Sequence, residues 1–339
     1  MHPLERAEHS DVRATARAAA SEGEADLRTG SLRGSGSRRE ENYDDRPRRS
    51  HPGSLRPSVT MTERMKMAAA VVLLTATTLY GGGDVRCRSR VTFDAAHLSV
   101  TMPFERTKNG VFVRVRANKN PDPLWFVIDS GSPRTLISEA AAKRTLINEM
   151  TRTDAVLSFD SVKVDRTDLR ITNLAPLSKA WGRTVDGVIG YELLCRTVVS
   201  IDYDAQRVTI AHPAVFKYEG MGETLPLTIR NGWSFVEGTI KVTGRPAVID
   251  NFFVDSGSRD AVNHPIIRES KGPVRTMNAG VVGPNEWFQL GHYTIGSTQS
   301  ACCGAEGDSS QHIGADVLSR FRVTFDYPHK RLIVARDAR

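Results

Sequence analysis

The stretch FVIDSG, residues 126–131, places an aspartate directly after an apolar run that is typical of a buried strand. An aspartate at a strand end often only begins a turn, because its side chain can accept a hydrogen bond from the following backbone. This chain, however, contains a second copy, FFVDSG at residues 252–257. Two copies in one chain indicate an internal repeat rather than two unrelated turns.

The sequence downstream of each copy repeats as well. Residues 188–203, VIGYELLCRTVVSIDY, match residues 312–327, HIGADVLSRFRVTFDY. The following strands also match, VTIA at 208–211 with LIVA at 332–335. Each half therefore contains an apolar strand ending in Asp-Ser-Gly-Ser, a variable middle, an Ile-Gly element, a short helix and two strands.

Alternating apolar residues and many short segments predict an all-β fold. Only SEAAAKRTLI, YELLC and ADVLSRF have a helical pattern. We expect two homologous β-barrel-like lobes related by a pseudo-twofold axis, the first over residues 100–215 and the second over residues 220–339.

If the lobes pack around that axis, the two Asp-Ser-Gly loops meet, and Asp129 faces Asp255. Two adjacent carboxylates cannot both ionise, so the pair shares one proton and titrates as a unit. The ionised partner can take a proton from a water that attacks an amide carbonyl. The protonated partner can polarise that carbonyl and later donate a proton to the leaving nitrogen. This chemistry requires no metal and no other cofactor.

The residues around the aspartates have expected supporting roles. The first serine of each copy is expected to tie its loop to the other lobe, and the second to hold the outer carboxylate oxygen. The glycine between them leaves room for backbone N–H groups to face the carboxylates. The Ile-Gly pairs are expected to pass behind the loops, where a side chain on the glycine would clash. These supporting residues are Ser130, Gly131, Ser132, Ser256, Gly257, Ser258, Ile189, Gly190, Ile313 and Gly314.

An apolar strand, Asp-Ser-Gly-Ser, and a hydrophobic-Ile-Gly element about 60 residues later together resemble the aspartic proteases. Duplication within one chain is similar to the pepsin-like enzymes. The endings DGVIGYELL…VSIDY and IGADVL…VTFDY are more similar to the bacterial retropepsin-related aspartyl proteases. The resemblance covers residues 109–335. It implies a bilobal pepsin/retropepsin-like fold, catalytic Asp129 and Asp255, and a monomeric endopeptidase with a peptide or protein substrate in a cleft between the lobes.

The resemblance also implies a flap over the substrate. In the second half, NAGVVGPNEW at residues 278–287 is the candidate, with Gly280 and Gly283 for a mobile turn and Trp287 as an apolar cover. In the first half, residues 155–162 are the candidate. Two residues depart from the family pattern: His312 replaces the usual apolar residue, and Asp260 adds a charge near the second loop.

A non-catalytic peptide-binding protein of the cell envelope, built on the same fold, is the alternative function, because a fold does not establish an activity.

Other classes of function are disfavoured by the sequence. The net charge of +7 is not concentrated in a basic block, so no nucleic-acid partner is expected. The nine histidines and four cysteines show no metal-ligand spacing, and no G-x-S-x-G motif marks a serine hydrolase.

The N-terminal residues have two expected parts. Residues 1–60 contain one aromatic residue and no apolar periodicity, so we expect disorder, or a true start at Met61, Met65 or Met67. Residues 61–83 combine Lys66, a charge-free run and three glycines, which predicts a signal peptide or a short anchor. We therefore expect an exported protein, periplasmic or secreted, with no other membrane contact. The oxidising compartment outside the cytoplasm permits one disulfide, and the sequence leaves its pairing open among Cys87, Cys195, Cys302 and Cys303.

Overall fold

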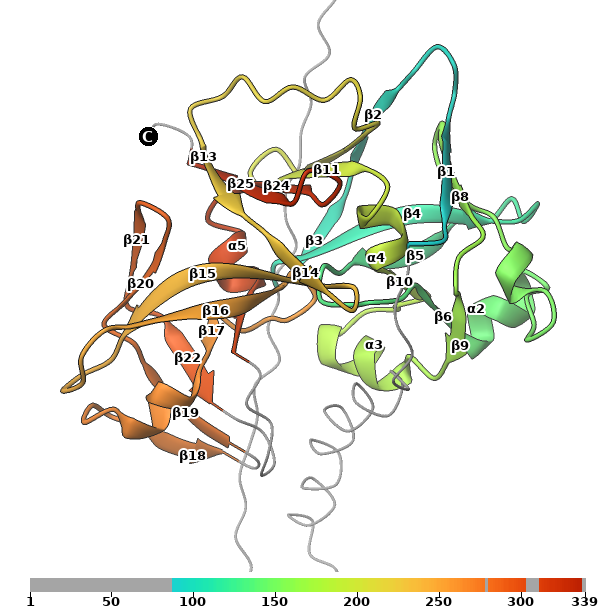
Figure 1. Ribbon diagram of the computed structural model, residues 1–339. Helices are drawn as coiled ribbons and strands as arrows, with labels where there is room; N and C mark the ends of the chain where they lie inside the picture. Colours follow the sequence, from blue (N-terminus) through green and yellow to red (C-terminus); the bar gives the residue numbers. More distant parts are fainter. Residues whose placement is uncertain (1–86, 278–279, 303–310, 337–339) are drawn as a thin grey trace, which may run out of the picture. The chain divides into compact units, whose positions relative to one another are not determined.

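Figure 1 shows a computed structural model of the chain, which describes residues 87–277, 280–302 and 311–336. The expectations for residues 1–60 and 61–83 lie outside these described residues. Within them the chain is mostly β, which confirms the predicted all-β class. None of the described helices is long and apolar enough to cross a membrane.

Residues of the first half form a nine-stranded sheet with the strand order β1-β8-β7-β4-β5-β10-β6-β9 and β3 paired to β4. The strands are β1 (Arg90–Phe93), β3 (Glu105–Thr107), β4 (Gly110–Ala117), β5 (Leu124–Ile128), β6 (Leu136–Ser138), β7 (Leu157–Phe159), β8 (Val162–Asp165), β9 (Arg170–Thr172) and β10 (Gly187–Ile189). Strand β4 illustrates why they form: Val113 and Val115 are fully buried, whereas Arg114 and Arg116 between and after them are exposed.

Residues of the second half form a ten-stranded sheet with the order β18-β19-β22-β17-β23-β16-β15-β20-β21 and β14 paired to β15. Its strands are β14 (Thr228–Arg230), β15 (Trp233–Lys241), β16 (Val248–Asp255), β17 (Val262–Asn263), β18 (Arg275–Met277), β19 (Gly280–Pro284), β20 (Trp287–Leu290), β21 (Tyr293–Gly296), β22 (Gln299–Cys302) and β23 (His312–Gly314).

The two sheets repeat one strand plan. The order β4-β5-β10-β6-β9 in the first corresponds to β15-β16-β23-β17-β22 in the second. In both, the strand that precedes the Asp-Ser-Gly loop pairs antiparallel with the strand before it and parallel with the Ile-Gly strand. The repeat seen in the sequence is thus also present in the topology.

A six-stranded sheet receives strands from both halves. Its order is β13-β25-β24-β11-β12-β2, and its strands are β2 (Ser99–Pro103), β11 (Val198–Asp202), β12 (Arg207–Ala211), β13 (Glu223–Pro226), β24 (Arg322–Asp326) and β25 (Arg331–Ala335). The central pair, β11 and β24, is antiparallel, and Ser200 Oγ lies 2.8 Å from Thr324 Oγ1 across it. This pairing joins the two halves (Figure 1).

Short helices complete the fold: α2 (Glu139–Arg144), α3 (Ala175–Trp181), α4 (Tyr191–Leu194) and α5 (Ala315–Leu318), with 3₁₀ turns at Arg152–Asp154 and Pro265–Glu269. Helices α2, α4 and α5 lie in the three predicted helical segments. Helix α3 was not predicted; it covers the outer face of β5 and β10, where Trp181 packs in a small core with Phe112 and Val188.

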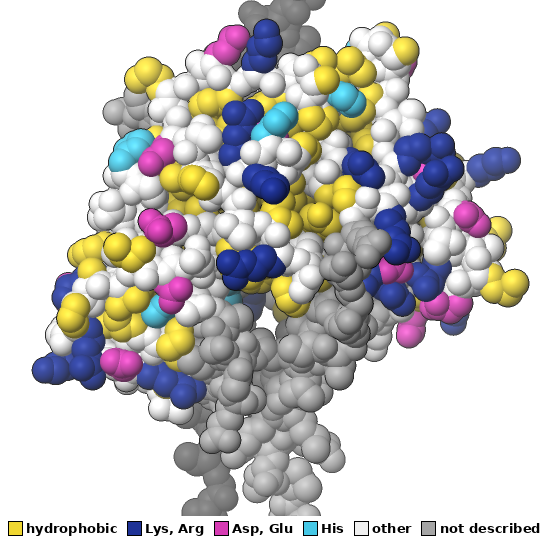
Figure 2. All heavy atoms as spheres, in the orientation of Figure 1, with side chains coloured by type: hydrophobic (Ala, Val, Ile, Leu, Met, Phe, Trp, Pro, Cys, Tyr) yellow, Lys and Arg dark blue, Asp and Glu magenta, His cyan; other side chains and the backbone are white. Residues whose placement is uncertain are grey.

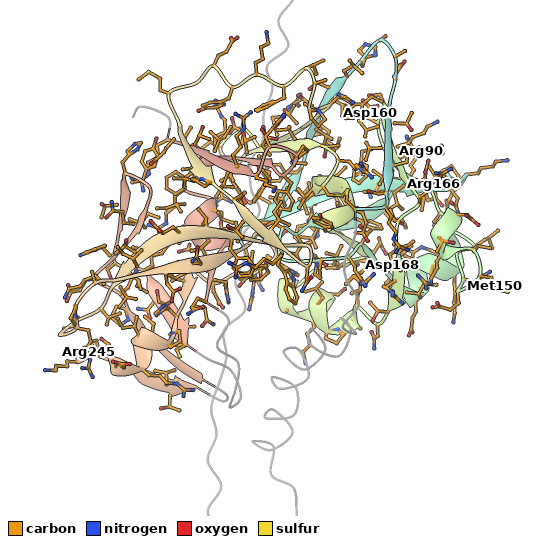
Figure 3. The ribbon with its side chains drawn as sticks, viewed as in Figure 1. Arg90, Met150, Asp160, Arg166, Asp168 and Arg245 are labelled. Carbon is orange, nitrogen blue, oxygen red and sulfur yellow. A yellow bond between two sulfur atoms is a disulfide. The ribbon has the colours of Figure 1, made fainter. Side chains whose placement is uncertain are left out.

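One face of the molecule carries its basic residues in a dispersed arrangement (Figure 2). Figure 2 shows Lys and Arg side chains spread among neutral and acidic ones over the face that it draws. Arg90 on β1 pairs with Asp165 on β8 at 2.8 Å, and Asp160 forms the β7–β8 turn with a φ of 53° (Figure 3). Arg90 and Asp160, which Figure 3 labels, belong to the outer part of the first sheet.

A disulfide joins Cys87, before β1, to Cys195, directly after α4, with 6.0 Å between their Cα atoms. Cys302 is also disulfide-bonded. The Cys87–Cys195 bond closes a separation of 108 residues. A cross-link over so long a loop removes much conformational entropy from the unfolded chain.

We predict that replacing Cys87 and Cys195 together with serine lowers the free energy of unfolding by about 2–5 kcal/mol. Either single replacement should cost nearly as much as the double one, because one missing sulfur already abolishes the bond. Urea denaturation of the three variants at equilibrium measures this. Unchanged midpoints would contradict it.

Candidate active site

Each candidate aspartate is positioned by a central strand. Strand β5 lies between β4 and β10 and is followed by Asp129, whereas β16 lies between β15 and β23 and ends at Asp255. Ile128 and Val254, just before the aspartates, are fully buried. The backbone N–H of Asp129 donates to Ile189 O at 2.9 Å. Strand pairing on both sides therefore fixes where each loop begins.

The two aspartates face each other. A Cβ atom added to Gly131 would overlap the carboxylate of Asp255, and one added to Gly257 would overlap that of Asp129. Each carboxylate thus lies directly against the loop of the other half, and the two carboxyl groups are within hydrogen-bonding reach. Glycine is required at both positions because any side chain would occupy the space of the opposite carboxylate.

Backbone N–H groups donate hydrogen bonds to both carboxylates. Asp129 accepts from Gly131 at 2.8 Å and also from Gly257. One oxygen of Asp255, Oδ1, accepts from both Gly257 at 3.0 Å and Ser258 at 2.9 Å. Such donors favour the ionised form of a carboxylic acid.

A reciprocal set of buried hydrogen bonds locks the loops together. The N–H of Ser130 donates to Ser256 Oγ at 2.9 Å, and the N–H of Ser256 donates to Ser130 Oγ at 3.0 Å. The hydroxyls in turn donate across the interface, that of Ser130 to Val254 O at 2.8 Å and that of Ser256 to Ile128 O at 3.1 Å. Both serines are buried. The structure places these two serines as the sequence analysis expected.

The Ile-Gly strands pass behind the loops. A Cβ on Gly190 would overlap the carbonyl oxygen of Ser132, and one on Gly314 would overlap that of Asp260. Ile189 and Ile313 are buried in the main core. Strands β10 and β23 therefore support the loops at a backbone-to-backbone distance that only glycine allows.

The second serine of each copy has its own hydrogen-bond partners. Ser132 Oγ donates to Arg134 O at 2.7 Å. The hydroxyl of Ser258 lies 3.3 Å from His312 Nε2 and accepts from the N–H of Asp260 at 3.3 Å. The Asp255 carboxylate is held by the backbone of Ser258.

Two aromatic residues that the sequence analysis did not assign to the site contact the first loop. The indole Nε1–H of Trp233 donates to Gly131 O at 3.1 Å. The buried hydroxyl of Tyr327 donates to Ser234 Oγ at 2.8 Å and lies 3.3 Å from Ser130 O. The available signals were the position of Trp233 directly after an Asn-Gly turn and the recurrence of a Tyr at the end of each repeat.

The buried position of Asp129 changes its pKa. Burial raises the pKa of Asp129 well above its usual 3.8, and the negative charge of Asp255 raises it further. The N–H groups of Gly131 and Gly257 oppose this shift. Nearby, a hydrogen bond from His312 lowers the pKa of Asp260. Among the described residues, no cluster of His, Cys, Asp and Glu is arranged to hold a metal.

The flap candidates separate in the structure. Gly280 and Gly283 lie on β19, which forms a hairpin with β18, and the tip at residues 278–279 lies outside the described residues. Trp287 begins β20 and pairs with Lys241 on β15, so it is not on that hairpin. In the first half, residues 155–162 include β7, and their apolar side chains alternate inward and are buried.

We predict that Ser130→Ala lowers the free energy of unfolding by about 1–3 kcal/mol, because Ser256 N–H and Val254 O would be left buried without this partner. Ser256→Ala should cost a similar amount, and the double variant less than the sum. Thr101→Ala is the control, since Thr101 Oγ1 shares an exposed hydrogen bond with Thr209 Oγ1. Equal and small losses of unfolding free energy in all variants would show that the reciprocal serine hydrogen bonds do not hold the loops together.

No protein-family model and no curated protein matches this chain, so its candidate site is defined by the geometry of the two Asp-Ser-Gly loops.

Proposed function

We propose that this chain is an aspartic endopeptidase in which Asp129 and Asp255 activate one water for attack on a peptide bond. The observation that carries the proposal is the pair of facing carboxylates, each lying against the glycine of the other loop. The reciprocal serine hydrogen bonds support it, because they hold two carboxyl groups close together, which a turn with only a structural role would not require.

The proton of the pair is assigned to Asp129. Burial raises the pKa of Asp129, and the negative charge of Asp255 raises it further. Asp255 then takes a proton from the water as the water oxygen bonds to the carbonyl carbon, and Asp129 gives its proton to the carbonyl oxygen. Asp255 then gives its proton to the amide nitrogen while Asp129 takes a proton from one diol hydroxyl, so that the C–N bond breaks and the C=O bond re-forms. The dyad ends with one shared proton, as it began.

The strand plan supports a bilobal pepsin/retropepsin-like fold. Each half has its own sheet with the same order of strands around an Asp-Ser-Gly loop, and the six-stranded sheet takes three strands from each half. On this proposal the lobes comprise residues 100–215 and 220–339, and the substrate lies between them over the two loops.

Aromatic side chains next to Asp255 favour a peptide with apolar side chains. Phe253, two residues before Asp255, has its ring 6.1 Å from that of Trp233 and 5.9 Å from that of Phe235. All three are half-buried. An apolar substrate side chain would remove the remaining exposed ring surface from water.

The disulfide favours an oxidising compartment. A Cys87–Cys195 bond persists outside the cytosol, where thiols are not kept reduced. Together with the signal-like residues 61–83, it supports export to the periplasm or beyond, with or without an N-terminal anchor. There the protein would act as a monomer on peptides or proteins.

We predict that Asp129→Asn and Asp255→Asn each reduce turnover of a cleaved peptide by about 10²–10⁴-fold or more. The double variant should be about as inactive as either single one, because each carboxyl sets the protonation of the other. Purified variants are compared with the wild-type chain on a mixed peptide library, with and without a statine-type inhibitor. Glu237→Gln, on the exposed part of β15, is the control.

The outcomes separate the two candidate functions. Near-normal turnover in either Asn variant would show that the aspartates are structural. A wild-type chain that binds the statine-type peptide but cleaves nothing would instead establish the non-catalytic peptide-binding protein.

The raised pKa of Asp129 also predicts how stability depends on pH. Between the ordinary pKa of an unfolded aspartate and the raised folded value, the folded chain binds more protons than the unfolded chain. This contribution is fully present below pH 3.8, and it is lost as pH rises through the folded pKa. Asp129→Asn should remove this slope and melt higher than the wild type near neutral pH. Parallel melting curves at all pH values would contradict the shift.

A further inference from the structure

His312 makes a connection in the second half that the first half lacks. It begins β23, and its side chain is 12% exposed. Its Nε2 atom lies 3.3 Å from the hydroxyl of Ser258 and 3.6 Å from Oδ2 of Asp260. Both partners belong to the loop that follows Asp255.

These contacts form a closed ring. The N–H of Asp260 donates to the same Ser258 hydroxyl at 3.3 Å, and the Asp260 carboxylate interacts with both Ser258 and His312. Arg259 adds a favourable charge next to Asp260, while its own Nη1 donates to Ala180 O at 3.0 Å. The hydroxyl of Ser258 is therefore fixed from two sides, although it does not touch the carboxylate of Asp255.

The position of Ser258 matters because its backbone holds Asp255. Ser258 N–H donates to Asp255 Oδ1 at 2.9 Å. A serine whose hydroxyl is anchored can rotate less, so this N–H stays directed at the carboxylate. A hydrogen bond to a carboxylate is among the stronger ones in proteins, so a small change in its geometry alters the carboxylate noticeably.

The first half shows what replaces this ring when it is absent. Strand register places Val188 beside Val127 and Leu136, just as it places His312 beside Phe253 and Asn263. Val188 is buried in the small apolar core under α3. The same backbone position is thus apolar next to Asp129 and an imidazole next to Asp255.

We propose that His312 is a positioning residue for Asp255: through the hydroxyl of Ser258 it fixes the backbone N–H that holds the Asp255 carboxylate. Asp260 orients the imidazole for this purpose. The consequence for turnover rests on the proposed peptidase function, whereas the consequence for the Ser258 N–H does not.

Hydrogen–deuterium exchange resolved at the Ser258 amide tests the proposal directly in the full chain. His312→Val, which introduces the residue of the first half, should speed exchange at this amide about tenfold. His312→Gln should restore most of the protection, because its amide nitrogen reaches as far as Nε2 of the imidazole. Asp260→Asn should give a smaller change in the same direction, and it serves as the second variant if His312→Val does not fold.

Peptide turnover by the same variants supplies the second measurement. His312→Val should lower kcat about tenfold with KM changed less than about twofold, since Asp255 is misplaced but the substrate surface is kept. His292→Val is the matched control: His292 pairs with Glu223 at 2.6 Å in an exposed turn of the second half. It should leave both measurements unchanged.

The possible results distinguish the two proposals. Unchanged exchange at Ser258 in His312→Val would overturn the positioning role, and so would equal damage by Gln and Val, which would indicate packing alone. If the wild-type chain cleaves no peptide but His312→Val exchanges faster at the Ser258 amide, the positioning role is supported and the peptidase function is rejected.

Discussion

The reciprocal hydrogen bonds between Ser130 and Ser256 are the constraint on which the site depends. Two carboxyl groups at this separation repel each other once both are ionised, so something must prevent the loops from parting. Separation would leave buried backbone N–H and C=O groups of both loops without partners, which is costly. In the proposed mechanism one shared proton removes the repulsion, so the serine hydrogen bonds and the proton together keep the carboxyl groups close.

This constraint also explains why the fold needs both halves. The partners of the serine hydroxyls, Val254 O and Ile128 O, lie at the ends of central strands in different sheets. The loops can meet only if the sheets are held in a fixed relation, and the β11–β24 pairing in the shared sheet supplies this relation. Tyr327, which directly follows β24, adds a contact from that sheet to Ser130 O.

Much of this arrangement could be predicted from the sequence because local patterns encode it. Alternation of apolar residues gave the strands, and the repeated Asp-Ser-Gly identified the loops that meet. Helix α3 was missed because its seven residues are too few to show a helical repeat of apolar residues. It forms because Trp181 packs against Gly110 and Phe112. The Cys87–Cys195 pairing could not be deduced either, since it depends on a three-dimensional distance between residues 108 positions apart.

The roles of Ser258 and His312 show a subtler limit. The repeat suggested that equivalent serines do equivalent work, and the backbones of the two halves do follow one plan. The side chains do not: Val188 completes an apolar core, whereas His312 turns to the loop and occupies the serine hydroxyl. In the proposed mechanism one carboxyl carries the proton while the other accepts one from water. Different neighbours on the same backbone allow the two carboxyls to differ in this way, whereas a fully symmetric site would make them equivalent.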